Sequence, residues 1–216
     1  MKFELPVCIA VSVLLTMLVF TNGHATISRL DGLVLLLCFA AFMWYSFHRD
    51  RKSAAQTESE YNYEEIPPLW KSIFTLLAGL AILITSCDFF VDNAVIIAKS
   101  FGVSDAFISL TLIACGTSLP ELAASIAAAL KKNTQLALGN VIGSNIFNIT
   151  WILGLSSQVM PLTSSGITIV DYLVMIGASI LPLIFGFRGK IGRLGGAVMV
   201  ICFVADNWYL ITNQIA

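Results

Sequence analysis

The sequence predicts an all-α, polytopic membrane helix bundle, and three observations lead to this prediction. Hydrophobic residues make up 57% of the 216 residues and charged residues only 12%, whereas about 25% of residues are charged in soluble domains. The mean hydropathy is +0.87. Several apolar stretches approach or exceed the ~20 residues that a helix needs to cross a ~30 Å hydrocarbon core. We therefore expect an integral membrane protein whose first partner is the lipid bilayer.

Seven segments are candidates for membrane-spanning helices. They cover residues 5–20, 30–47, 69–98, 107–130, 136–160, 167–187 and 194–211. The third, fourth and fifth are longer than a perpendicular crossing requires, so we expect them to be tilted, kinked or broken. The first segment follows Lys2 as in a signal peptide, but Glu4 interrupts the basic region and no convincing cleavage site follows, so we interpret it as a retained helix.

The basic residues indicate the orientation, because Lys and Arg favour the cytoplasmic side of a membrane. Ten of the twelve fall on one side of the predicted topology: Lys2, Arg49, Arg51, Lys52, Lys71, Lys131, Lys132, Arg188, Lys190 and Arg193. Only Arg29 and Lys99 fall on the other. We expect a cytoplasmic N-terminus and an external C-terminus, in the inner (plasma) membrane of a bacterium.

Composition also narrows the class of protein. The net charge of −1 indicates no nucleic-acid partner. The five cysteines stand singly in apolar stretches, as small hydrophobic residues. No nucleophile–base pair, phosphate loop or metal-hydrolase spacing is present, so we predict neither an enzyme nor a resident cofactor.

One polar stretch, His48 to Pro68, interrupts the apolar chain. Its acidic second half suits either a solvated linker, which such runs usually are, or a surface that gathers cations. We expect three parts: two transmembrane helices at 1–50, a cytoplasmic linker at 51–68 and a five-helix membrane domain at 69–216.

Five acidic residues lie within or at the edges of apolar segments: Asp88, Asp92, Glu121, Asp171 and Asp206. A carboxylate at the bilayer centre costs about 2.5–3.5 kcal/mol on insertion scales, so each needs a partner or a function. Asp171 and Asp206 suit an interfacial position better than a functional one, and Asp92 suits either.

Glu121 stands in "GTSLPEL", residues 116–122, where the pattern is that of a helix start. Ser118 suits the N-cap, Pro120 the first turn, and Glu121 the third position of a capping box. In a soluble protein this would explain the motif fully. Here the new helix would begin inside the apolar span, where irregular backbone persists only if it is buried in protein or lines a polar cavity. Such a break leaves carbonyls, including those of Ala114 and Thr117, available as ligands.

The next segment contains "GNVIGSNIFN", residues 139–148, in which Asn140, Ser144 and Asn148 recur at helical spacing and form one polar stripe. By itself this stripe suits a helix-packing seam, with Gly139 and Gly143 allowing close approach. Together with the broken helix it completes an all-oxygen set of carboxylate, hydroxyl, amide and carbonyl groups. Hard cations such as Ca²⁺ and Na⁺ prefer such ligands, and paired broken helices near the midplane are how many transporters build their sites.

These two motifs, at this spacing, resemble the alpha repeat of the calcium/cation antiporter superfamily, in its prokaryotic sodium/calcium exchanger type. The repeat covers about 107–158, and "ISRLDGLVLLL" in the second segment resembles the end of the family's first half. The resemblance implies that Glu121 is a main cation ligand and that Ser118 and Ser144 are hydroxyl ligands. Thr117 is implied to offer its carbonyl, Asn148 to lie at the central site, and Ala114 to offer a further carbonyl.

The resemblance also implies ten helices in two inverted halves, each with one alpha repeat, whereas this sequence has one GTSLPE motif and matches the last seven helices. The strong basic bias argues against an inverted second copy. We expect an antiporter of Ca²⁺ against Na⁺ or H⁺ that requires a first repeat, for which a separate N-terminal exchanger half is the expected partner. The alternatives are a non-transporting subunit derived from an exchanger and a cation/proton exchanger.

Overall fold

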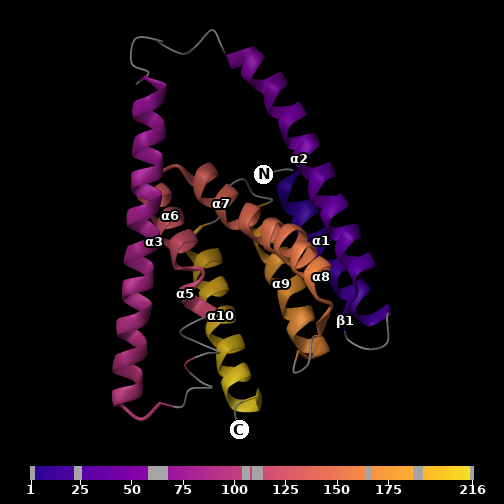
Figure 1. Cartoon of the computed structure of the whole chain (residues 1–216), viewed down its shortest axis with the longest axis vertical. Coiled ribbons are helices and arrows are strands. Elements are labelled where there is room, and N and C mark those ends of the chain that lie inside the picture. The colour runs from indigo at the N-terminus through magenta and orange to yellow at the C-terminus, as the bar shows by residue number, and fades with distance from the viewer. Residues whose placement is uncertain are drawn as a thin grey trace. The chain divides into compact units, whose positions relative to one another are not determined.

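The computed structural model describes residues 3–21, 26–57, 68–103, 108, 114–163, 167–186 and 192–214. Its helices are α1 (Glu4–Thr21), α2 (Arg29–Thr57), α3 (Leu69–Ser100), α5 (Ala114–Gly116), α6 (Leu119–Leu130), α7 (Thr134–Phe147), the π-helical turn η3 (Asn148–Ile152), α8 (Leu153–Val159), α9 (Ile169–Gly186) and α10 (Arg193–Gln214). Two short strands, β1 (Thr26–Ile27) and β2 (Leu162–Thr163), complete the described elements (Figure 1). The predicted all-α class is confirmed.

Four described helical stretches have the length and composition to cross a membrane: Glu4–Thr21, Arg29–Arg49, Leu69–Ser100 and Thr134–Val159. Two shorter apolar helices cover Leu119–Leu130 and Ile169–Phe185. All seven predicted segments contain helix, although residues 107 and 109–113 of the fourth lie outside the described part.

The three long segments differ from one another. The third is one unbroken helix of 32 residues. The fourth is broken between α5 and α6, and the fifth is continuous but contains the turn η3.

Helix α2 extends beyond its predicted end at residue 47 and runs to Thr57, into the stretch expected to be a linker. Residues 51–57 include Arg51, Lys52, Ala54 and Ala55, and all of these are good helix formers. Local propensity therefore continues the helix after its apolar part has ended. Residues 58–67 of the predicted linker lie outside the described part.

The chain divides into two compact units, Met1–Trp44 with Ala128–Ala216, and Tyr45–Ala127. In the first unit, α1 packs against α7 and α9. Its largest core cluster contains Leu15, Val19, Leu35, Ile149 and Tyr172. A second cluster joins α1 to α7 through Leu5, Cys8, Ile142 and Ile146.

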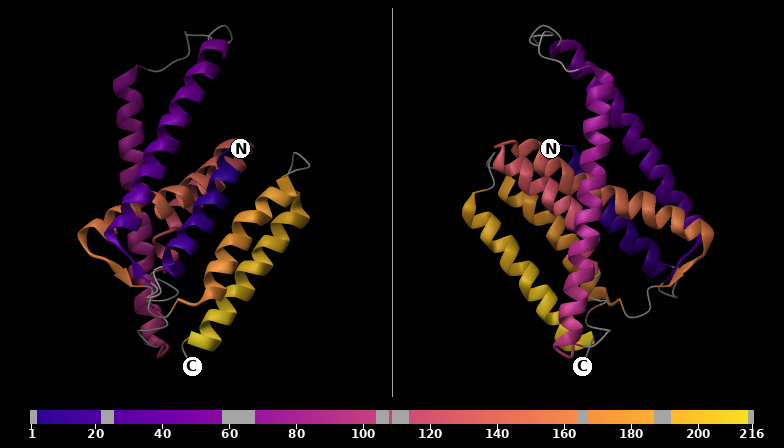
Figure 2. Two further views of the ribbon diagram at one scale, coloured as in Figure 1. Left: turned by 90° about the vertical axis from the view of Figure 1, so that its right-hand side faces the viewer. Right: turned by 60° about the vertical axis from the view of Figure 1, so that its left-hand side comes forward.

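Glycines allow two close contacts between helices of the first unit. Helices α2 and α8 meet at glycines, because a Cβ added to Gly154 would lie 3.1 Å from the Gly32 carbonyl oxygen. Helices α9 and α10 run side by side (Figure 2), with Gly195 against the ring of Phe185. Small residues at such crossings let apolar helices pack closely in lipid.

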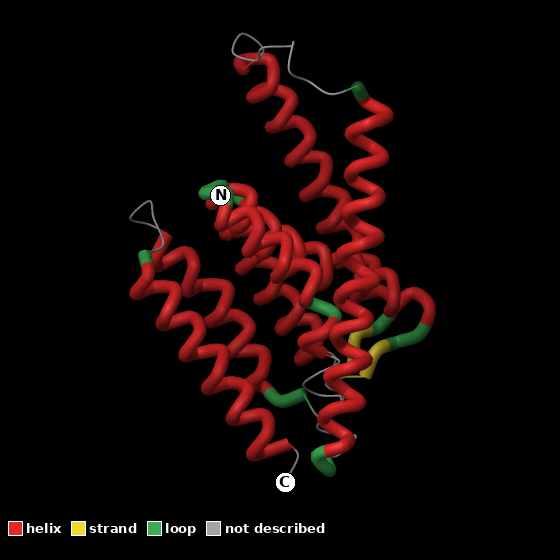
Figure 3. The backbone as a smooth tube through the Cα atoms, turned by 90° about the vertical axis from the view of Figure 1, so that its left-hand side faces the viewer, coloured by secondary structure: helices red, strands yellow, loops and turns green. Residues whose placement is uncertain are grey.

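A two-stranded antiparallel ribbon links two loops of the first unit, with Thr26 paired to Thr163 and Ile27 to Leu162 (Figure 3). These strands were not predicted from the sequence, because two residues are too few for an alternating pattern to be recognised. The ribbon joins the α1–α2 connection to the α8–α9 connection.

The second unit contains α3 and α5, which are in contact. None of the residues of α3 is buried within the described part of the chain. Its exposed apolar side chains include Phe74, Leu77, Ile82 and Phe89, as expected of a helix with a mean hydropathy of 2.1 over its spanning window.

Candidate cation site

The predicted interruption in the fourth segment is present. Helix α5 ends at Gly116, Thr117 and Ser118 form a turn, and α6 begins at Leu119. The backbone N–H of Ser118 donates to the Cys115 carbonyl at 3.0 Å, and the N–H of Leu122 donates to the Ser118 carbonyl at 3.0 Å. The prediction of a helix start in this apolar stretch is therefore confirmed, with Ser118 at the N-cap position.

Two residues explain why the chain breaks here. Pro120 has no N–H to donate, and in a continuous helix its ring would clash with the carbonyl four residues earlier, that of Gly116. Gly116 itself lies against α3, because a Cβ at this position would come within 2.5 Å of Val91 Cγ2. The break is thus set locally by Pro120 and held against α3 by Gly116.

The oxygen-bearing residues at the break differ in exposure. Thr117 and Ser118 are exposed, whereas Glu121 is half-buried and its Oε2 atom is withdrawn from solvent. Glu121 lies in the first turn of α6, where the helix dipole favours a negative charge. Ala114 is the first residue of α5, so its carbonyl belongs to the short helix before the break.

The second predicted group lies on α7 and at its end. Ser144 is half-buried and its Oγ donates to the Val141 carbonyl at 3.0 Å. Asn148 is exposed, caps the C-terminus of α7 and begins η3. Ile142 and Ile146 are buried on the opposite side of the helix, so the predicted polar stripe does lie away from the packed face.

The six predicted ligands fall into two groups in different units. Ala114, Thr117, Ser118 and Glu121 belong to Tyr45–Ala127, and Ser144 and Asn148 belong to the unit that includes Ala128–Ala216. The structure brings the first four together around one helix break and places the last two one helical turn apart. That both groups share a single cation stays a prediction.

The glycines of the polar stripe, predicted to allow close approach, have no such contact in the described part of the chain. A Cβ added to Gly139 or Gly143 meets no described atom within 4 Å. The close glycine contact is instead at Gly32 and Gly154. The sequence signal for that contact was weak, because the two glycines are isolated and far apart in the chain.

Asp171 has a local structural role. Its Oδ2 accepts hydrogen bonds from the backbone N–H of Thr168 at 2.6 Å and from the Thr168 hydroxyl at 2.9 Å. Ser28 and Asp31 form the same arrangement at the start of α2. These contacts satisfy N–H groups that a helix start leaves unpaired, which agrees with a position for Asp171 at the end of the span.

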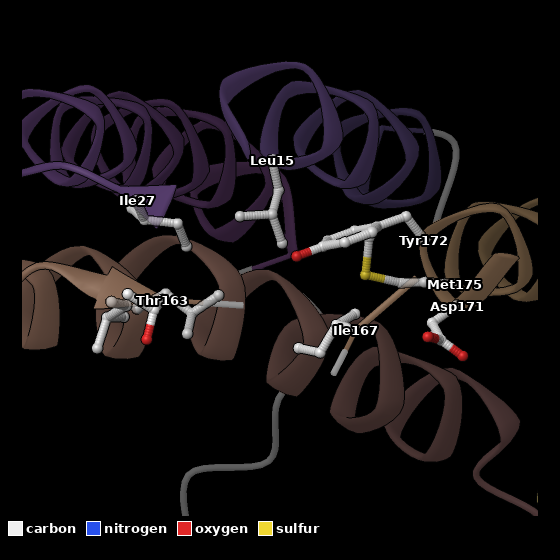
Figure 4. A pocket seen from close by; sticks show the side chains of 9 residues that line it. Leu15, Ile27, Thr163, Ile167, Asp171, Tyr172 and Met175 are labelled. Carbon is white, nitrogen blue, oxygen red and sulfur yellow. The ribbon is translucent and has the colours of Figure 1, made fainter. Parts of the chain in front are cut away.

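A cavity of about 320 Å³ lies in the first unit, lined by Leu15, Ile27, Leu153, Leu162, Thr163, Ile167, Asp171, Tyr172 and Met175. Figure 4 shows Leu15 above Tyr172 and Met175, with the carboxylate of Asp171 at the edge and directed away from Leu15. None of the six predicted ligands lines this cavity. Its apolar walls make it a gap in the core beside the ribbon and unsuited to a cation.

Comparison with known proteins identifies the class. The family described as "Sodium/calcium exchanger protein" matches residues 71–212. CaxA of Alkalimonas amylolytica is 35% identical over 221 residues, covering 98% of this chain and 68% of CaxA. The sodium/calcium exchanger MaX1 of Methanosarcina acetivorans is 42% identical over 137 residues, covering 62% of this chain and 39% of MaX1.

A solved structure of the sodium-calcium exchanger NCX_Mj, soaked with zero Na⁺ and Ca²⁺, matches with a TM-score of 0.72 and 32% identity. The match covers 96% of this chain and 66% of that chain. This chain therefore spans about two thirds of the length of CaxA and NCX_Mj. With a family match over residues 71–212 and a relative that is 35% identical and covered to 68%, this chain belongs to the sodium/calcium exchanger family of membrane proteins.

Proposed function

We propose that this chain provides the second alpha repeat of a secondary active antiporter that moves Ca²⁺ against Na⁺ or H⁺. The observation that supports this most directly is the helix break at Thr117–Ser118, with Glu121 half-buried in the first turn of α6. A carboxylate and two hydroxyls gathered at a helix break in an apolar span are rare and mark ion pathways in membrane proteins.

The chemistry of the proposed site follows from its ligands. Ca²⁺ takes six to eight oxygens at about 2.3–2.6 Å. Glu121 supplies the charge, Ser118 and Ser144 supply hydroxyls, and Asn148 supplies an amide oxygen. Thr117 and Ala114 supply carbonyls. Na⁺ or a proton competes for the same oxygens, and this competition couples the two fluxes.

One repeat provides one carboxylate in this ligand set, which leaves the charge of Ca²⁺ incompletely balanced. We propose that a first alpha repeat completes the site, either from a further part of the same protein or from a separate N-terminal half. Transport then proceeds by alternating access, in which α1 and α2, with that N-terminal part, rock against the bundle that carries Glu121. We place the protein in a bacterial inner membrane with its N-terminus in the cytoplasm.

The test is sodium-driven uptake of ⁴⁵Ca²⁺ into vesicles that contain this chain with and without an N-terminal fragment bearing the first repeat. Uptake is expected only in the complemented sample. Glu121→Gln, which keeps the side-chain shape and removes the charge, is expected to abolish it. The matched control is Glu58→Gln in the polar stretch, which should transport as the unmodified chain does. Uptake that survives Glu121→Gln would refute the proposal.

The single GTSLPE motif supports a second candidate, a membrane subunit that kept the fold and lost transport. It predicts no gradient-driven uptake in the complemented vesicles under any driving ion. A cation/proton exchanger predicts uptake driven by a pH gradient and unchanged by Na⁺. Uptake is therefore measured in the same vesicles with a Na⁺ gradient, with a pH gradient and with neither. The three results distinguish the sodium-driven antiporter, the non-transporting subunit and the cation/proton exchanger.

A further inference from the structure

The helical stretch Thr134–Val159 contains a π-helical turn that begins at a proposed ligand. The backbone N–H of Asn148 donates to the Ser144 carbonyl with ordinary α spacing. The N–H of Leu153 instead donates to the Asn148 carbonyl, five residues earlier. The helix therefore widens from Asn148 to Ile152, and such turns occur frequently at functional sites.

The wide turn keeps two packing surfaces on the same side of the helix. At about 100° per residue, a straight α-helix would rotate Gly154 roughly 120° away from Ile142, and one extra residue reduces this to roughly 20°. Ile142 and Ile146 are buried before the turn, and Gly154 and Ser157 are buried after it. The polar stripe that ends at Asn148 stays on the opposite side, where Asn148 is exposed.

Thr150 lies at the centre of the turn and is completely buried. Its hydroxyl donates to the Ile146 carbonyl at 2.6 Å. Side-chain bonds of this kind from Thr to the carbonyl four residues earlier bend helices. The hydroxyl thereby holds a carbonyl of α7 at the place where the spacing of the backbone bonds changes.

An aromatic group supports the same turn from α2. The Trp151 ring lies 5.1 Å from the ring of Phe39 and 6.3 Å from that of Phe147, measured between centroids. Phe39 and Phe147 are 5.7 Å apart in an edge-to-face arrangement. The buried hydrogen bond of Thr150 therefore holds the turn on one side, and the packed rings hold it on another. Neither of these contacts involves the side chain of Asn148.

We infer that Thr150 is a positioning residue for cation binding: its hydroxyl fixes the π-helical turn that sets the direction of the Asn148 side chain. This inference rests on the proposed function, since it concerns the affinity of that site. Thr150 does not itself reach the cation, because its hydroxyl is buried and directed at the Ile146 carbonyl.

The experiment measures the KM for Ca²⁺ and kcat of sodium-driven uptake in the complemented vesicles. Thr150→Val keeps the shape and removes the donor, and we expect a KM roughly two- to tenfold higher, the range set by the net value of one hydrogen bond. We expect Thr150→Ser to restore the KM and Thr150→Cys, with a weaker donor, to give an intermediate value. If Thr150→Val fails to fold, the KM values of Thr150→Ser and Thr150→Cys still test the inference.

The matched control is Thr85→Val. Thr85 makes the same bond, from its hydroxyl to the Ala81 carbonyl at 2.8 Å, but on the exposed surface of the unbroken helix α3. Its KM should equal that of the unmodified chain. A residue with a merely structural role would lower the yield of folded protein without moving the KM, which would overturn the inference.

A double-mutant cycle shows whether Thr150 acts through Asn148. If it does, Thr150→Val adds nothing to the KM of Asn148→Ala, since the side chain that it positions is already gone. Additive effects would overturn the inference and leave the proposed function intact. If Asn148→Ala itself has no effect on the KM, the assignment of Asn148 as a ligand fails instead.

Discussion

Ser12 shows how a single polar residue is accommodated inside an apolar helix pair. It is completely buried on α1, and its hydroxyl lies 3.4 Å from the hydroxyl of Ser179 on α9. It also donates to the Cys8 carbonyl at 2.9 Å. In lipid, hydroxyls that meet across helices replace the water that each would otherwise need.

We predict that Ser12→Ala lowers the stability of the detergent-solubilised protein by about 0.5–1.5 kcal/mol, because the Ser179 hydroxyl loses a neighbour in a buried site. Thermal unfolding, followed by the loss of monodisperse protein, measures this. The control is Ser100→Ala, since Ser100 is exposed and its hydroxyl donates within its own helix end, to the Ile97 carbonyl. Equal midpoint temperatures of thermal unfolding for Ser12→Ala and Ser100→Ala would contradict the prediction.

The residues of the proposed site were predictable to different degrees. The helix start that carries Ser118 and Glu121 was predicted from sequence because the spacing of a capping box is local, and their role as cation ligands stays a prediction. The polar stripe that ends at Asn148 was predicted from its helical period. The position of Thr150 in a π-helical turn was not predicted, because a Thr in an apolar helix looks like any small buried residue until the hydrogen-bond spacing around it is known.

At the scale of elements, the break between α5 and α6 depends on contact with α3 as well as on Pro120. A Cβ at Gly116 would lie 2.5 Å from Val91 Cγ2, closer than atoms tolerate, and 3.3 Å from Val91 Cγ1, which is tight. Val is stiff about χ1, so it cannot turn away cheaply. The position of the broken helix is therefore coupled to α3.

We predict that Gly116→Ala weakens sodium-driven Ca²⁺ uptake and destabilises the protein by about 1–3 kcal/mol, as overpacking does. The added methyl group pushes α5 away from α3 and displaces Thr117 and Ser118. Val91→Ala in the same chain should restore both properties by removing the clashing methyl groups. Gly79→Ala, at a glycine of α3 with no described atom within 4 Å of the added Cβ, should weaken neither property, because Ala is the better helix former.

Elements were predicted well where the apolar pattern was long and poorly where the backbone departs from it. The end of α2 was placed ten residues early, because the prediction followed hydropathy while Ala, Arg and Lys continue the helix. The turn η3 and the β1–β2 ribbon left no pattern in the sequence. A single wide turn changes the helical period by one residue, and two-residue strands are shorter than any alternation.

At the scale of the whole molecule, the orientation in the membrane can be tested directly. Ten of the twelve basic residues lie on one predicted side, and this bias sets topology. We predict that alkaline phosphatase fused after Ala216 is active in bacteria and that a green fluorescent protein at the same place is dark, since the C-terminus is predicted to be outside. The opposite pair of results would reverse the topology. A fusion within residues 58–67 is the internal reference and should give the inverse pattern.

What the sequence by itself determined is the membrane-protein class, the helical segments, the helix break at Ser118 and the polar stripe that ends at Asn148. Each rests on local chemistry: hydropathy, a cap, a proline and a helical period. Only the tertiary structure decided that α1 packs on α7 and α9, that Gly32 meets Gly154, and that a π-helical turn begins at Asn148. These depend on which distant surfaces meet, and in a chain where most surfaces are apolar, hydropathy does not distinguish one partner from another.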